Sequence, residues 1–302
     1  MPDKFLRDLV HGDLSVGKHK IAFLDLLLTV CITGAAVMIR NSIFGIAGSG
    51  KISDGMRLLL CGMDLLLGAV MAGIIWKTTE NRLKTVGIYA LTVIWPAIAG
   101  NSALNGGREI LGAVLLMIIL FGIVRKELYS KGIYWSFVIE TCGFQILYAD
   151  LSGEKLTNCW PNLYTLFSET GFVTEYGTTG KLLTIGILLM IFYYISKKKP
   201  QVSMELLTAS GLFFTLFIVT FYPFMNYRSG LLANVFALLV FIQNQKKWYV
   251  PVAMCTISYV SYGYFYNGTI GVFFWIYALA LIALMLDAGV AFYKQLQTGN
   301  AE

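Results

Sequence analysis

The chain has 302 residues, of which 57% are hydrophobic and only 13% are charged. Soluble domains carry about a quarter charged residues, so this composition excludes a soluble globular protein and indicates an integral membrane protein. The formal net charge of +6 does not indicate nucleic-acid binding, because the Lys and Arg residues gather at the ends of apolar segments.

Ten apolar segments follow one another along the chain. A helix needs about 20 apolar residues to cross the hydrocarbon core of a bilayer, and the first segment, 21–39, has that length. In chain order we predict membrane spans at residues 21–39, 58–76, 86–100, 109–124, 132–148, 182–196, 204–222, 229–243, 249–265 and 269–290. The predicted fold class is therefore all-α, a polytopic bundle of about ten transmembrane helices. Its parts are an N-terminal segment at 1–20, a transmembrane domain at 21–292 and a tail at 293–302.

The Lys and Arg residues predict the orientation of these spans. Sixteen of them lie on the side of the N-terminus and seven on the other side. An excess of Lys and Arg marks the cytoplasmic side, so we expect a multi-pass protein of the plasma membrane with both termini in the cytoplasm. The seven residues expected outside are Arg40, Lys51, Arg57, Arg108, Lys155, Lys181 and Arg228. The longest outer connection is predicted at residues 149–181.

Histidine and cysteine offer little chemistry. The only histidines, His11 and His19, precede the first span, which excludes a histidine base or a histidine metal site within the membrane domain. The five cysteines form no CxxC motif and no Cys/His pairing. We interpret them as small hydrophobic side chains.

Polar residues instead gather at three outer junctions. The first, residues 95–109, contains a proline and three glycines; the second is 158–164; the third is 222–230 and continues into Asn234. Broken backbone at membrane depth is tolerated where it lines a cavity or is buried in protein. We therefore predict that the three junctions meet at one outward-facing cleft.

The amino-acid sequences of these junctions resemble the motifs of a known family. The matching residues are Pro96, Ala97, Asn101, Ser102, Ala103 and Gly106 in the first junction, Asn158, Pro161, Asn162 and Tyr164 in the second, and Pro223, Met225, Arg228, Leu232 and Ala233 in the third. In this order they resemble the motifs of the GT-C superfamily of multispan glycosyltransferases, particularly bacterial proteins similar to GPI mannosyltransferases.

This resemblance implies a GT-C-like helical bundle that uses or binds a polyprenyl-phosphate sugar in cell-envelope or lipid-linked glycan assembly. Such a transfer needs a carboxylate that takes a proton from the acceptor hydroxyl and a cation that holds the departing phosphate. The resemblance implies Asp54 and Glu109 as catalytic carboxylates. It implies substrate or phosphate binding by Arg228, Arg108, Asn226, Tyr227, Asn101, Asn162 and Asn234. The implied partners are membrane lipid and another membrane glycosyltransferase subunit. No metal ligand is assigned, although a divalent cation is compatible with the family.

The chain also departs from the family pattern. Gly107 and Glu109 stand where the family has Gln and Asp, and Asn226 and Tyr227 stand where it has His and Glu. The first outer connection is short, and Asp54 is its only acid. Three functions therefore stay open: an active transferase, a non-catalytic accessory or lipid-binding subunit, and a small-molecule transporter or flippase. The last would require paired broken helices in two related halves, and the sequence has no such repeat.

Simpler interpretations of single residues stay open as well. Arg228 could merely extend to the membrane interface, and Glu109 could be a solvated residue at a helix N-terminus. Asp64, inside the second span, indicates either a functional group or a polar contact with Asn or Ser on a neighbouring helix. A further carboxylate, Glu140, lies in the middle of the fifth span.

Overall fold

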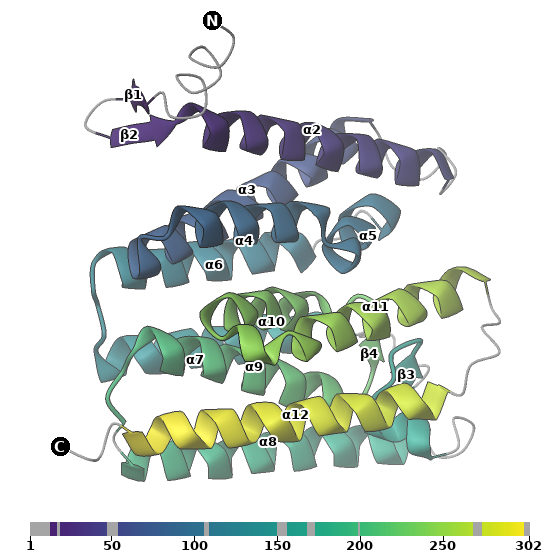
Figure 1. The fold of residues 1–302 in the computed structure, drawn as a ribbon. Coiled ribbons are helices and arrows are strands. Elements are labelled where there is room, and N and C mark those ends of the chain that lie inside the picture. The colour runs from purple at the N-terminus through teal and green to yellow at the C-terminus, as the bar shows by residue number, and fades with distance from the viewer. Residues whose placement is uncertain are drawn as a thin grey trace, which may run out of the picture. The chain divides into compact units, whose positions relative to one another are not determined.

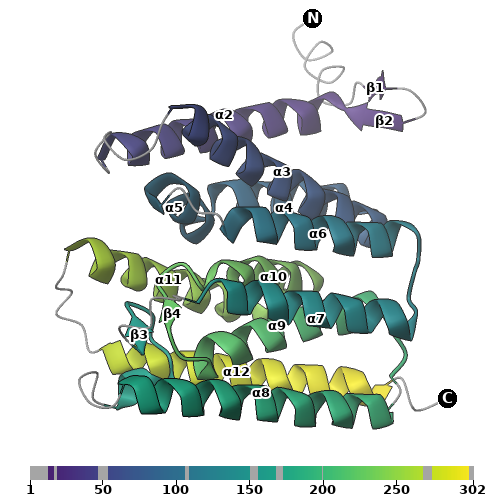
Figure 2. The same ribbon diagram turned by 180° about the vertical axis from the view of Figure 1, so that it is seen from behind.

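The computed structural model describes residues 13–16, 19–46, 54–105, 109–149, 156–167, 173–198, 200–267 and 274–298. The chain divides into two compact units, residues 1–106 and 107–302, and we describe each by itself. The helices and strands of both are labelled in Figure 1 and seen from behind in Figure 2.

The described residues of the first unit form a short antiparallel hairpin followed by four helices. Strands β1 (Asp13–Val16) and β2 (His19–Ala22) pair from Asp13 opposite Ala22 to Val16 opposite His19. The helices are α2 (Phe23–Ile46), α3 (Asp54–Thr79), α4 (Arg82–Ile94) and α5 (Pro96–Asn105). α3 packs on α4, and α5 contacts each of the other three helices.

The third predicted span is broken in two. Pro96 has no backbone N–H, so the helix hydrogen bond to the carbonyl of Thr92 is lost. Trp95 adopts an extended backbone with ψ of 121°, and the axes of α4 and α5 differ by 42°. Two parts of one apolar segment therefore meet at an angle beside α2 and α3.

Among the residues that the structure describes, the second unit contains seven α-helices and a small parallel sheet. The helices are α6 (Glu109–Arg125), α7 (Lys131–Leu147), α8 (Val173–Lys198), α9 (Met204–Phe221), α10 (Leu231–Gln243), α11 (Tyr249–Asn267) and α12 (Phe274–Thr298). Strands β3 (Thr157–Asn158) and β4 (Met225–Asn226) pair in parallel. Two short 3₁₀ turns, η1 (Leu163–Leu166) and η2 (Gln245–Lys247), complete the connections.

α9 and α10 form the core of this unit. α9 packs against α7, α10 and α12 (Figure 1). Nearly every side chain of α9 and α10 is buried. A Cβ atom at Gly211 of α9 would clash with the ring of Phe236 on α10, so only glycine allows the two helices to lie this close.

The structure confirms the all-α class, and every predicted span overlaps a helix among the described residues. Five of these helices have the length and hydropathy needed to cross a membrane, and the bent pair α4–α5 would make a sixth. The count of ten spans is not confirmed. α10, for example, has 13 residues, which at 1.5 Å per residue gives about 20 Å, less than the roughly 30 Å hydrocarbon core.

Candidate functional site

The candidate site is built on the turn that joins α9 to α10. Pro223 follows the end of α9, and Phe224 adopts a positive φ of 64° that reverses the chain. The backbone N–H of Phe224 donates to the carbonyl of Leu156 at 2.8 Å, and β4 then pairs with β3. The second and third junctions therefore lie side by side, while the meeting of all three at one outward-facing cleft stays a prediction.

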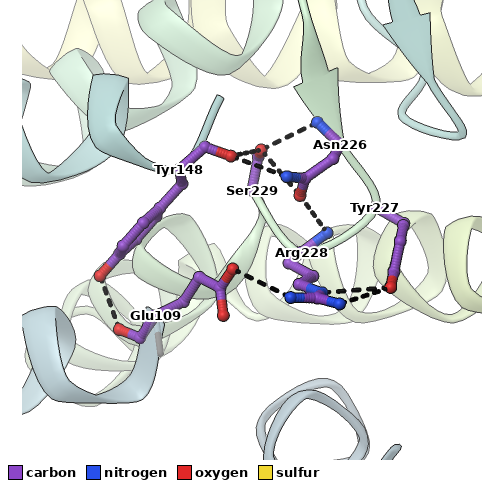
Figure 3. Close-up of polar contacts among 6 residues, drawn as sticks. All are labelled: Glu109, Tyr148, Asn226, Tyr227, Arg228 and Ser229. Carbon is purple, nitrogen blue, oxygen red and sulfur yellow. Dashed lines mark hydrogen bonds and ion pairs between the residues drawn. The ribbon is translucent and has the colours of Figure 1, made fainter. Parts of the chain in front are cut away.

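Two side chains of the turn bind the carbonyl of Tyr148 at the end of α7 (Figure 3). The amide nitrogen of Asn226 donates to the carbonyl of Tyr148 at 2.9 Å, and the hydroxyl of Ser229 donates to the same carbonyl at 3.3 Å. The side-chain oxygen of Asn226 accepts the backbone N–H of Arg228 at 2.9 Å. Asn226, expected to bind substrate, thus has its amide engaged in shaping the turn that presents Arg228.

Arg228 is held on its neighbour Tyr227. Its Nε and Nη2 atoms donate to the Tyr227 hydroxyl oxygen at 3.1 and 2.9 Å. The ring of Tyr227 stacks on Phe265 of α11, with centroids 3.8 Å apart. Burial raises the pKa of Tyr227 although Arg228 lowers it, so the phenol stays neutral at pH 7. Burial lowers the pKa of Arg228, but the Tyr227 hydroxyl and Glu109 raise it by more, so the guanidinium stays charged.

Glu109 lies opposite this guanidinium, in the first turn of α6. Its Oε1 atom is 3.7 Å from Nη1 of Arg228, and its side chain is 9% exposed against 32% for the arginine. The other oxygen, Oε2, is buried and accepts no hydrogen bond from the part of the chain that the structure describes. The hydroxyl of Tyr148 donates to the backbone carbonyl of Glu109 at 2.6 Å, which fixes the start of α6 (Figure 3). The interpretation of Glu109 as a solvated helix end is therefore wrong.

This arrangement places an anion-binding group and a proton acceptor together. A guanidinium has five N–H donors, and the hydrogen bonds to Tyr227 use two of them. The remaining N–H donors can reach an anion from the exposed side of Arg228, and the carboxylate of Glu109 can accept a proton. Among the residues that the structure describes, no three His, Cys, Asp or Glu side chains lie close enough together to hold a metal ion.

Five further residues were predicted for the site, and the structure describes the side chains of three of them. Asn162 is fully buried and caps η1 by accepting the N–H of Tyr164 at 3.0 Å. Asn234 donates to the hydroxyl of Ser258 at 2.9 Å and so joins α10 to α11. Asn101 belongs to the first unit, where its amide is buried and makes no hydrogen bond. Asp54 begins α3, but its side chain lies outside the described residues, as does all of Arg108.

The first unit contains a polar network that the sequence did not predict. Arg40 was expected in an outer connection, but α2 continues past it and its side chain is only 1% exposed. Its Nε atom donates to Oδ2 of Asp64 at 2.6 Å, and its Nη1 atom donates to the carbonyl of Val93 at 2.6 Å. The hydroxyl of Ser102 donates to the same Asp64 oxygen. The sequence indicated the serine contact of Asp64 but not its cation.

No protein-family profile, no curated protein sequence and no solved structure matches this chain.

Proposed function

We propose that this protein is a multi-pass protein of the cell membrane that binds a polyprenyl-phosphate sugar at the Glu109–Arg228 pair. In this proposal it is a GT-C-like glycosyltransferase homologue of envelope or lipid-linked glycan assembly. Its ten apolar segments cross the bilayer, with the bent pair α4–α5 counted as one, and both termini lie in the cytoplasm. The turn at Tyr222–Gly230 then faces the outer side.

The observation that carries the proposal is the pairing of Glu109 with Arg228 across 119 positions of sequence. The two residues were predicted separately, one as a base and one as a phosphate ligand. Phosphate bound to Arg228 would compete with the carboxylate for the guanidinium, which would free Glu109 to accept the proton of an acceptor hydroxyl. The guanidinium would at the same time stabilise the charge on the departing phosphate.

Binding tests the first half of this proposal. A short-chain polyprenyl phosphate is titrated into the purified full-length protein in detergent, with the Arg228→Ala and Arg228→Lys variants beside it. Charge-assisted hydrogen bonds contribute about 1.5–3 kcal/mol, so Arg228→Ala should weaken binding roughly ten- to hundredfold. Arg228→Lys should lose less, because an ammonium keeps the charge but not the planar pair of donors.

The matched control is Arg125→Ala, because Arg125 is the exposed arginine at the opposite end of α6. It should bind like the parent. Equal affinity of the parent and both Arg228 variants would mean that Arg228 only extends to the membrane interface. The proposed phosphate site at Arg228 would then be wrong.

Glu109→Gln separates a transferase from a lipid-binding subunit. If the protein transfers sugar, this variant should lower the rate by about two to four orders of magnitude, the range of general-base catalysis, while phosphate binding stays. The second candidate function, an accessory subunit without transfer, is favoured by the ion pair itself, because the only carboxylate described at the site is already engaged. Binding without any transfer by the parent would support that alternative.

Orientation is tested by labelling. A cysteine introduced at Gly153, in the predicted outer connection, should react in intact cells with a thiol reagent that does not cross the membrane, and the parent should report the background of the native cysteines. Labelling only after access to the cytoplasmic side would contradict the proposed topology.

A further inference from the structure

Two exposed aromatic rings lie beside Arg228. Phe265 and Tyr266, in the last turn of α11, are 43% and 44% exposed. Phe265 stacks on Tyr227 with ring centroids 3.8 Å apart, and the ring of Tyr266 meets Phe265 edge to face at 5.1 Å. Tyr266 is also close enough to Arg228 to interact with its charge. The rings of Phe265 and Tyr266, named here the aromatic platform, therefore adjoin the guanidinium on the side of Tyr227.

The aromatic platform is held in place by the rings behind it. Tyr227 is only 4% exposed. Phe265 covers one face of its ring, and Tyr262 packs against it edge to face with centroids 5.9 Å apart. The hydroxyl of Tyr227 meanwhile accepts both hydrogen bonds from Arg228. One phenol therefore fixes the platform and the guanidinium relative to each other.

The aromatic platform lies at the end of α11 that extends past α10. The hydrogen bond from Asn234 to Ser258 fixes the two antiparallel helices relative to each other. Residues 259–267 of α11 continue about 13 Å past this bond, whereas residues 231–233 of α10 continue about 5 Å in the same direction. α11 therefore extends beyond the start of α10 (Figure 1). In the proposed orientation this end faces the outer side, at the level of the lipid headgroups.

A ligand that binds both groups needs an apolar face and an anionic group. The rings offer apolar surface, and the guanidinium beside them offers charge-assisted hydrogen bonds to phosphate. A prenyl tail is apolar, but it lies in the hydrocarbon, away from this end of α11. A hexose on the phosphate fits better, because the C–H groups on one face of a pyranose ring pack on an aromatic ring while its hydroxyls stay in water. Position and chemistry together therefore favour the sugar over the tail.

We propose that the aromatic platform is a sugar subsite, on which the hexose of a polyprenyl-phosphate sugar packs while Arg228 binds its phosphate. This inference rests on the proposed function, since it needs a phosphate at Arg228. It adds the recognition of the sugar itself. The chain then binds the sugar-loaded lipid in preference to the same lipid without its sugar, whether or not it transfers that sugar.

Ligands that differ only in the sugar test the aromatic platform. A short-chain polyprenyl phosphate is prepared as its glucose, mannose and galactose diesters and as its methyl diester, which has the same single negative charge and the same tail. Each is titrated into the purified full-length protein in detergent. We expect at least one hexose diester to bind the parent roughly three- to tenfold more tightly than the methyl diester, the size of one aromatic contact.

The ratio of these two affinities, named here the sugar preference, separates the platform from Arg228, because a disturbed Arg228 would lower both affinities together. Phe265→Leu removes a ring and should bring the sugar preference close to one, whereas Phe265→Tyr keeps an aromatic ring and should keep a preference. Tyr266→Leu should lower the preference as well, and it replaces Phe265→Leu where that variant does not fold. The matched control is Tyr259→Leu, because Tyr259 lies on the same helix and is 69% exposed. It should keep the sugar preference of the parent.

Two results would overturn the inference alone. A parent that binds the methyl diester as tightly as every hexose diester has no sugar subsite. A sugar preference that stays at the value of the parent in both Phe265→Leu and Tyr266→Leu would mean that these rings only support Tyr227, contact the tail or belong to the interfacial aromatic belt. Failure of the proposed function is read separately. If the parent binds none of the diesters, or if Arg228→Ala binds them like the parent, the phosphate site is wrong and the sugar subsite with it.

Discussion

The buried pair of Arg40 and Asp64 should stabilise the first unit in a way that a double-mutant cycle can measure. Arg40 is 1% exposed and Asp64 is fully buried, with Nε and Oδ2 2.6 Å apart. The pair joins α2 to α3, and its further bonds to Val93 and Ser102 reach α4 and α5. One ion pair therefore connects the four helices that the structure describes in this unit.

The magnitudes follow from what each substitution leaves behind. Asp64→Leu leaves a buried guanidinium without its anion, and Arg40→Met leaves a buried carboxylate without its cation, so each should cost about 3–5 kcal/mol. The double variant removes both charges and should recover nearly all of this loss. It would still lack the donor to the carbonyl of Val93, a cost of about 1–3 kcal/mol.

The assay is equilibrium unfolding of the full-length protein in mixed micelles, with hydrogen exchange of residues 54–105 reporting on the first unit. We expect the double variant to be less destabilised than the sum of the two single variants by several kcal/mol. If Asp64→Leu unfolds within 1 kcal/mol of the parent, or if the double variant equals the sum, the pair does not hold the four helices together.

Two further predictions concern the second unit. A Cβ at Gly230 would lie 2.7 Å from Cζ3 of Trp160. In a thermal unfolding scan, Gly230→Ala should therefore destabilise the protein by about 1–3 kcal/mol through overpacking. The control is Gly122→Ala, which should not lower stability because a Cβ there would meet nothing within 4 Å. Burial lowers the pKa of Lys247, but Asp287 and Tyr249 together raise it by more, so the folded pKa lies above the ordinary 10.5. The stabilisation by this pair is therefore complete below about pH 10.5 and is lost as the pH rises through the folded pKa. It should amount to less than about 1 kcal/mol, because both groups are partly exposed; an Asp287→Asn variant that shows the same loss of stability at high pH would contradict this assignment.

The helices could be predicted from hydropathy because each of them coincides with an apolar segment of the sequence. Their ends could not. α2 continues through Arg40 because Asp64 and the carbonyl of Val93 neutralise and bind the guanidinium, and charge counting treats such an arginine as a loop residue. α10 begins only at Leu231, because the preceding residues form the turn that carries Arg228.

The sequence predicted single residues of the site but not which of them are in contact. Glu109 and Arg228 could be named from their motifs, but nothing local in the sequence indicates that they meet. Their contact depends on the tie from Tyr148 to Asn226 and on the pairing of two-residue strands, which leave no periodic signal. The sequence likewise did not indicate that the amide of Asn162 caps η1 or that the amide of Asn234 joins α10 to α11.

The phosphate site is tested most directly by a density map of the full-length protein in a lipid bilayer with a short-chain polyprenyl phosphate. We expect phosphate density about 3 Å from the guanidinium of Arg228, beside the carboxylate of Glu109, with the lipid tail between helices. Phosphate density elsewhere on the protein, or Arg228 still paired with Glu109 and no ligand at saturating concentration, would contradict it.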